Sequence, residues 1–196
     1  MKMQDCEPYN NSDINCMILA MMDLQPTLLS AIKNNNELID SCQITLRAFQ
    51  SLNIPVALTE QVPQKLGRTH ESLRSLILPD YPVFEKNSFS AFGCEPFLNY
   101  LKSHNCKHLV LAGVETSICI YLTAISGIQS GFKVTILSDV VSGRRECVAI
   151  DVFHDLRSRG VSILPLETFL YSLLRSSIHP CFKNISLLIR KREIYS

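Results

Sequence analysis

Apolar runs of strand length alternate along the chain with longer segments whose apolar residues recur at helical spacing. This alternation is typical of βαβ units built around a parallel sheet that is buried on both faces. We therefore predict an α/β fold with six strands. The predicted strands are Cys16–Met22, Pro55–Thr59, Val83–Glu85, His108–Gly113, Lys133–Leu137 and Val161–Leu164.

The segments between these runs favour helices. In Glu37–Ser51, the residues Leu38, Ile39, Cys42 and Leu46 fall on one helical stripe, which predicts a helix with one buried face. The further predicted helices are Glu95–Ser103, Ser117–Ser130, Arg145–Arg159, Glu167–Arg175 and a short basic amphipathic one, Asn184–Arg192.

The longest stretch without periodicity is Glu60–Tyr81, which contains Pro63, Gly67 and Pro79. It predicts a long loop after the second strand, and long ordered loops in compact domains are often functional.

A chain of 196 residues, 46% of them hydrophobic, favours one domain, here 1–196, with an N-terminal extension (1–13) and a C-terminal tail (176–196). The net charge of +1 and the mixed signs offer no extended basic face, so nucleic acid is not an expected partner. Met1–Asp13 has no features of a secretory signal, and no apolar run reaches the roughly 18 residues that span a bilayer. We expect no membrane association.

The eight cysteines form no CxxC pair and no cysteine-histidine spacing typical of zinc sites. A reducing, cytoplasmic location fits this usage best, and most of these cysteines are expected to be small buried hydrophobes. We expect no metal and no cofactor.

Three residues with the chemistry for hydrolysis lie just after predicted strands: Asp23, Lys86 and Cys119. Ligands of open parallel sheets bind beyond the carboxyl ends of the strands, so these side chains could converge there. A thiol in the first turn of a helix beside a cation shifts toward the thiolate, Asp23 could take the thiol proton, and backbone N–H groups from Glu115 to Cys119 could bind an oxyanion. Alternatively, Asp23 caps the turn at Leu24 to Pro26, Lys86 is a solvated strand end and Cys119 is a core thiol.

At these residues the chain resembles the isochorismatase-like cysteine hydrolases, which include nicotinamidases and carbamoylsarcosine amidohydrolases. The blocks are MDLQ (Met22–Gln25), FEKNSFSAF (Phe84–Phe92) and AGVETSICI (Ala112–Ile120), and the resemblance covers about residues 14–175. It implies that Asp23, Lys86 and Cys119 form the catalytic triad on a three-layer, Rossmann-like α/β/α sandwich with a six-stranded parallel sheet. It also implies a cis peptide bond between Val114 and Glu115, an oxyanion site at the N–H groups of Glu115 and Cys119, and a homo-oligomer, dimer or tetramer.

The similarity is closer to the eukaryotic isochorismatase-domain-containing proteins of unassigned substrate. TEQVPQKLG (Thr59–Gly67) resembles their loop after the second strand, and HPCFKNISLLI (His179–Ile189) resembles their tail.

Two departures from the sequence pattern of this family narrow the range of reactions that we expect. Nicotinamidases of this family carry an Asp-x-His metal motif after the second strand, whereas this chain has Thr59-Glu60-Gln61, with His70 as the one histidine of the following loop. A metal-dependent nicotinamidase is therefore not predicted. True isochorismatases generally lack the cysteine, so Cys119 favours hydrolysis of an acyl or C–N bond.

We therefore predict a metal-independent cysteine hydrolase acting on a small amide or a related small-molecule substrate. Gln25, Glu60, Phe89 and Phe92 are candidate pocket residues, with ordinary packing as the alternative. A catalytically idle scaffold or regulatory protein is a second hypothesis. A ribonuclease or RNA-binding role is a third, because some protozoan relatives carry a ribonuclease label, although the near-zero net charge argues against it.

Overall fold

The computed structural model describes residues 14–193, whose six strands form one parallel sheet in the order β3-β2-β1-β4-β5-β6. This confirms the predicted fold class. The strands are β1 (Met17–Met22), β2 (Val56–Gln61), β3 (Val83–Lys86), β4 (His108–Val114), β5 (Lys133–Ser142) and β6 (Ser162–Leu164). The predicted N-terminal extension, 1–13, lies outside the described residues.

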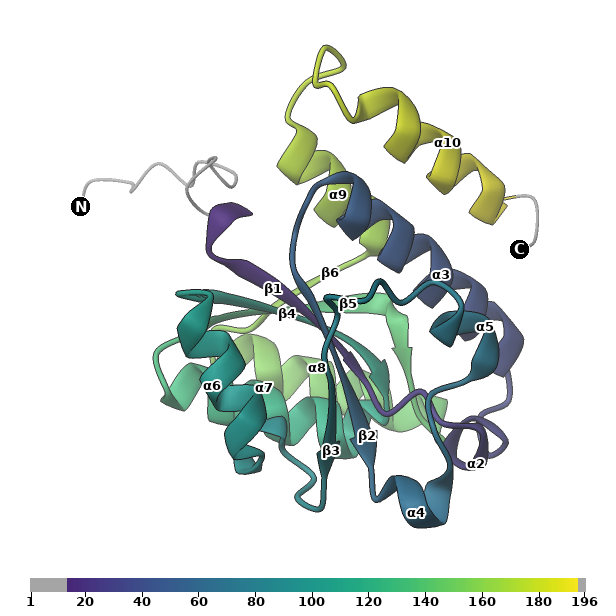
Figure 1. Cartoon of the computed structure of the whole chain (residues 1–196), viewed down its shortest axis with the longest axis vertical. Helices are drawn as coiled ribbons and strands as arrows, with labels where there is room; N and C mark the ends of the chain where they lie inside the picture. The colour runs from purple at the N-terminus through teal and green to yellow at the C-terminus, as the bar shows by residue number, and fades with distance from the viewer. Residues whose placement is uncertain (1–13, 194–196) are drawn as a thin grey trace.

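Helices cover both faces of the sheet (Figure 1). On one face, α3 (Asn35–Ser51) and α9 (Leu166–Leu174) pack on the strands, and α10 (Phe182–Glu193) packs outside them. The opposite face is covered by α6 (Glu95–Ser103), α7 (Tyr121–Gln129) and α8 (Glu146–Ser158). Within residues 14–193, every helix is too short or too polar to cross a bilayer.

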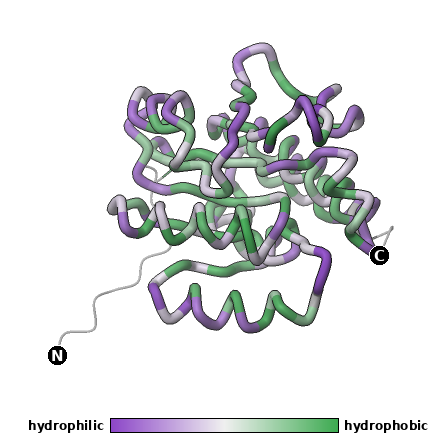
Figure 2. Tube along the Cα trace, turned by 90° about the horizontal axis from the view of Figure 1, so that it is seen from below, coloured by the Kyte–Doolittle hydropathy of each residue, from purple (hydrophilic) through white to green (hydrophobic). Residues whose placement is uncertain are grey.

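The central strand β1 shows why a strand inside this sheet is a nearly continuous apolar run in the sequence. Its side chains alternate between the two layers, with Met17, Leu19 and Met21 in one core cluster and Ile18 and Ala20 in the other. Successive residues of a strand point to opposite faces, so a strand covered on both sides needs apolar residues at every position. The helices need them on one stripe only, and hydrophobic and hydrophilic residues accordingly alternate along them in Figure 2.

The segment Glu60–Tyr81 is more structured than predicted. Strand β2 continues through Gln61, and the short helices α4 (Pro63–Leu66) and α5 (Glu71–Arg74) follow, as does α2 (Pro26–Leu29) after β1. Four-residue helices are too short to show a helical period, which is why the sequence pattern missed them. Likewise, β5 continues to Ser142, past the predicted end at Leu137.

The strand order places a topological switch point between β1 and β4. The chain moves from β1 to β2 and β3 on one side, and then returns to β4 on the other side of β1. Loops leaving neighbouring strands in opposite directions leave a crevice at the carboxyl edge of the sheet, where ligands of such folds bind.

Candidate active site

Three side chains far apart in the sequence meet at this carboxyl edge. Asp23 directly follows β1 in a left-handed conformation (φ 54°), and Lys86 is the last residue of β3. Cys119 lies in a π-helical turn, Thr116–Ile120, that follows β4 and leads into α7. The predicted helix Ser117–Ser130 therefore begins as a wider turn before it becomes α-helical.

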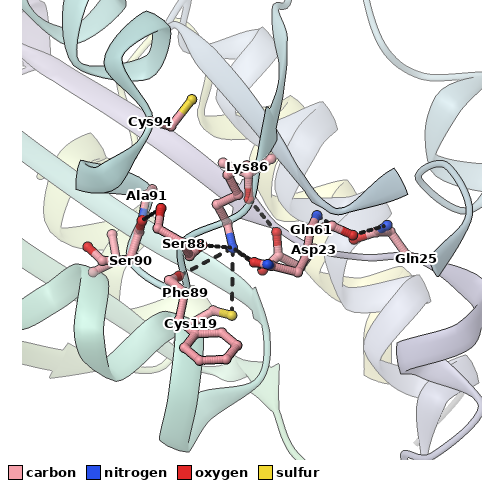
Figure 3. Close-up of polar contacts among 12 residues, drawn as sticks. Asp23, Gln25, Gln61, Lys86, Ser88, Phe89, Ser90, Ala91, Cys94 and Cys119 are labelled. Carbon is pink, nitrogen blue, oxygen red and sulfur yellow. Dashed lines mark hydrogen bonds and ion pairs between the residues drawn. The ribbon is translucent and has the colours of Figure 1, made fainter. Parts of the chain in front are cut away.

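The ammonium group of Lys86 is the centre of the cluster (Figure 3). Its Nζ lies 2.7 Å from Asp23 Oδ2 and 3.7 Å from Cys119 Sγ. The side chains of Asp23 and Lys86 are completely buried, and Cys119 is 6% exposed. This contradicts the alternative in which Lys86 is a solvated strand end. Cys119 does lie in the core cluster on its face of the sheet, as the core-thiol alternative expects, but its sulfur also contacts the Lys86 ammonium.

A long side chain is needed at position 86 because β2 lies between β3 and β1. Lys86 is in register with Gln61 of β2, and its ammonium reaches past that strand to the residue after β1. On the far side, Thr59 of β2 donates its hydroxyl to Asp23 Oδ1 at 2.7 Å. Both carboxylate oxygens of Asp23 are thus held, one by a hydroxyl and one by an ammonium.

Lys86 Nζ faces more acceptors than it has protons. Besides Asp23 and Cys119, it lies 2.6 Å from Gln61 Oε1, 3.2 Å from Phe89 O and 3.3 Å from Ser88 O. An ammonium has three protons, and the two shortest contacts are those with Gln61 and Asp23. The third proton is shared among two carbonyl oxygens and the sulfur.

The thiol of Cys119 is protonated in this arrangement. Burial, and after it the charge of the Asp23 carboxylate, raise its pKa to about 12, and the Lys86 ammonium offsets only part of this shift. The predicted net shift of Cys119 toward the thiolate was therefore wrong, although Lys86 lowers the pKa of the thiol as expected. Desolvation and a neighbouring carboxylate both oppose the release of a proton to water, and they outweigh one cation.

The segment between β4 and Cys119 has an unusual backbone. The Val114–Glu115 peptide bond is cis, and the Glu115 carboxylate accepts a hydrogen bond from Arg144 Nε at 3.0 Å. Thr116 is buried, and its hydroxyl has no hydrogen-bond partner among residues 14–193. A hollow of about 400 Å³ opens beside this segment and is lined by Glu115, Ser117, Arg144, Arg145 and Val148.

Two of the four candidate pocket residues are turned away from the triad. Gln25 is fully buried, and its amide bonds the backbone of Gln61 and the carbonyl of Gly67. Glu60 is 2% exposed, and its carboxylate accepts bonds from Thr69 and Arg68. Both therefore order the segment after β2, because their polar atoms are already engaged by the chain itself.

The two phenylalanines differ. Phe92 packs edge-on against Phe97 and Phe132, with ring centroids 6.4 and 5.5 Å apart, so its role is packing. Phe89 is 57% exposed, and its carbonyl contacts Lys86. Of the four, Phe89 alone remains a candidate for contact with a substrate.

Thr59 and Gln61 belong to the site, although the sequence analysis used them only to argue against a metal motif. The Thr59 hydroxyl contacts Asp23, and the Gln61 amide contacts Lys86. The sequence could have indicated them by their spacing. Thr59 and Gln61 are two positions apart in a strand, so both side chains lie on the same face of the sheet. Among the described residues, no group of three or more histidine, cysteine or acidic side chains could hold a metal ion, and His70 Nδ1 bonds Ser72.

Comparison with known proteins shows the family to which this chain belongs. The model of the isochorismatase domain matches residues 17–164, which spans the whole sheet. The chain belongs to the isochorismatase family. Among its relatives, isochorismatase domain-containing protein 2 of Danio rerio is 32% identical, over 88% of this chain and 86% of its own length. The predicted resemblance to eukaryotic proteins of this family is confirmed.

Two solved structures share this isochorismatase fold. The MAR1 ribonuclease of Caenorhabditis elegans superposes with a TM-score of 0.84 at 29% identity, covering 90% of each chain. The YcaC gene product of Escherichia coli, described as an octameric hydrolase of unknown specificity, has a TM-score of 0.81 at 20% identity, covering 96% of this chain and 99% of its own. Isochorismatase-like proteins are generally hydrolytic.

Proposed function

We propose that this protein is a metal-independent cysteine hydrolase that cleaves a small amide or a related acyl or C–N substrate. The observation that carries the proposal is the buried cluster in which one ammonium, Lys86 Nζ, contacts both a carboxylate and a thiol. A nucleophile, a proton acceptor and a fixed cation within one buried cluster are the groups that acyl transfer through a covalent intermediate requires.

The raised pKa of Cys119 fits a proton transfer inside the cluster. Losing the thiol proton to water would leave two anions, Asp23 and the thiolate, facing one cation in a buried site. Passing the same proton to Asp23 keeps the total charge of the cluster unchanged, and Lys86 then faces the thiolate. The proton of such coupled groups belongs to the pair and not to one residue.

In the proposed reaction, Cys119 Sγ bonds to the substrate carbonyl carbon while Asp23 accepts the thiol proton. The C–N bond then breaks, the leaving nitrogen takes the proton from Asp23, and a thioester remains on Cys119. Water attacks the thioester, Asp23 accepts one proton of the water, and the released sulfur regains it as the acid departs. The N–H groups of Glu115 and Cys119 are the proposed donors to the oxyanion.

The pH dependence of alkylation tests this proposal. Because the proton moves to Asp23 and not to water, we expect the rate of Cys119 alkylation by iodoacetamide to change less than about twofold between about pH 6 and 8, whereas N-acetylcysteine gains about tenfold per unit below its pKa. Mass spectrometry of the Cys119 peptide gives the rate, and the Asp23→Asn protein is the control. A Cys119 peptide that stays unmodified, as in an idle scaffold, or that follows N-acetylcysteine contradicts the proposal.

A ribonuclease is the second candidate, and the likeness to the MAR1 ribonuclease, at 29% identity, favours it. Ribonuclease activity would demand contacts with phosphates and hence binding that weakens steeply with salt. The net charge of the chain is +1, so its cations are not in appreciable excess over its acidic groups for such contacts. We expect no RNA binding at about 150 mM salt in a fluorescence-anisotropy titration with a single-stranded RNA. Salt-dependent binding, with cleavage that Cys119→Ala removes, would favour the ribonuclease instead.

A further inference from the structure

Gln61 makes a hydrogen bond with every polar group that it has. Its N–H donates to Gln25 Oε1 at 2.7 Å, and its carbonyl accepts from Gln25 Nε2 at 3.0 Å. In its side chain, Nε2 donates to Asn87 O at 2.9 Å, and Oε1 accepts from Lys86 Nζ at 2.6 Å. The residue is 7% exposed and is therefore fixed at both its backbone and its amide.

We propose that Gln61 is a positioning residue that holds the Lys86 ammonium between the carboxylate and the thiol and leaves its positive charge intact. The inference rests on the proposed function, because it assigns a role within the same site. Figure 3 shows Gln61 and Asp23 beside the Lys86 nitrogen, with Gln25 on the side of Gln61 that faces away from Lys86.

The orientation of the Gln61 amide follows from its partners. A lysine ammonium can only donate, so the atom facing Lys86 is the amide oxygen, and the Asn87 carbonyl can only accept, so the NH₂ group faces it. A flipped amide would lose both bonds. The oxygen is consequently locked in place, and it fixes one of the three protons of Lys86 and thereby the direction of the other two.

The neutrality of the amide is the second part of the inference. The ionisable groups that contact Lys86 Nζ are Asp23 and Cys119. The other acidic groups nearby are engaged elsewhere: Glu60 and Glu85 bond Arg68, and Glu115 bonds Arg144. The thiol of Cys94 donates to the carbonyl of Glu85. A neutral acceptor at position 61 therefore leaves the cluster with one cation, one carboxylate and one proton to share.

A glutamine that only filled space in β2 would not require an amide oxygen. The strand-packing alternative predicts that shape alone matters, so a variant of nearly the same shape that still folds, with methionine or glutamate at position 61, would leave the reactivity of Cys119 unchanged. The positioning role predicts the opposite, since a second carboxylate on Lys86 would compete with the thiolate for the same cation.

The test compares Gln61→Met, Gln61→Glu and the control Gln64→Met. Gln64 is exposed and donates to Glu85 at the edge of the sheet, away from the triad. Iodoacetamide alkylation of the Cys119 peptide is measured from about pH 5.5 to 8, and thermal unfolding is followed in parallel. We expect Gln61→Met to react about tenfold to a hundredfold more slowly, the range for losing a hydrogen bond to a charged group, and Gln64→Met to react at the wild-type rate.

Gln61→Glu gives the sharper result. We expect its alkylation to be slow at about pH 8 and to recover toward the wild-type rate at about pH 5.5, because burial and the neighbouring Asp23 carboxylate raise the pKa of the new carboxyl above its ordinary value. Wild-type rates at both pH values in this variant, or in a folded Gln61→Met protein, would overturn the inference. If Gln61→Met fails to fold, the isosteric glutamate variant decides. Failure of wild-type Cys119 to react at all would instead contradict the proposed function.

Discussion

Replacement of Asp23 by asparagine is expected to abolish turnover and to lower the free energy of unfolding by about 3–5 kcal/mol. The carboxylate is the proposed proton acceptor, so its loss stops the chemistry. It is also the charge opposite Lys86, and both side chains of this pair are completely buried. Removing one partner leaves an uncompensated charge in the interior, which is far more destabilising than losing a surface ion pair. Denaturant unfolding monitored by circular dichroism measures this effect.

The double variant Asp23→Asn/Lys86→Met separates the two consequences. Methionine fills much of the space of the lysine without its charge, so the double variant should recover most of the lost stability and remain inactive. As a control, Asp155→Asn removes a solvent-accessible carboxylate that pairs with Arg159 one helical turn away. We expect this control to change the free energy of unfolding little. An Asp23→Asn protein as stable as the wild type would mean that this carboxylate and the Lys86 ammonium are not a buried pair.

Substitution of Gly113 by alanine is the second change with a large expected effect. Gly113 in β4 lies in register with Met22, directly before Asp23, and has φ +111°. A Cβ at Gly113 would lie under 3.0 Å from the O, N and C atoms of Met22, which are backbone atoms that cannot move aside. We expect the free energy of unfolding to fall by about 3–5 kcal/mol, because the substitution combines a strained positive φ with overpacking. A shift in the midpoint of urea unfolding measures this effect.

Gly131→Ala provides the matched control. Gly131 also has a positive φ, +83°, but a Cβ there would meet no atom within 4 Å. Its cost should be limited to the backbone strain, about 1–2 kcal/mol. If the two alanine variants lost the same free energy of unfolding, the close approach of β1 and β4 would not limit the size of the residue at position 113. The comparison bears on the site, because this approach places Asp23 beside the segment that carries Cys119.

The sequence alone was sufficient to predict the six parallel strands and the positions of three chemical groups. Both inferences rest on local information. Burial on both faces makes a central strand such as β1 a continuous apolar run, and the residues that follow such a run mark the carboxyl edge of the sheet. Asp23 and Lys86 were found directly after such runs and Cys119 six residues after one, and the order of the three blocks matched that of the resembling family.

Only the tertiary structure decided which groups touch these three residues and in which direction the pKa of Cys119 is shifted. Thr59 and Gln61 entered the site because the register of β2 with β1 and β3 puts their side chains beside Asp23 and Lys86, and no local pattern encodes that register. The raised pKa of Cys119 likewise depends on how deeply the sulfur is buried and on which charge lies nearer. Apolar periodicity records where the chain is buried, whereas electrostatics depends on distances between strands that become defined only when the sheet assembles.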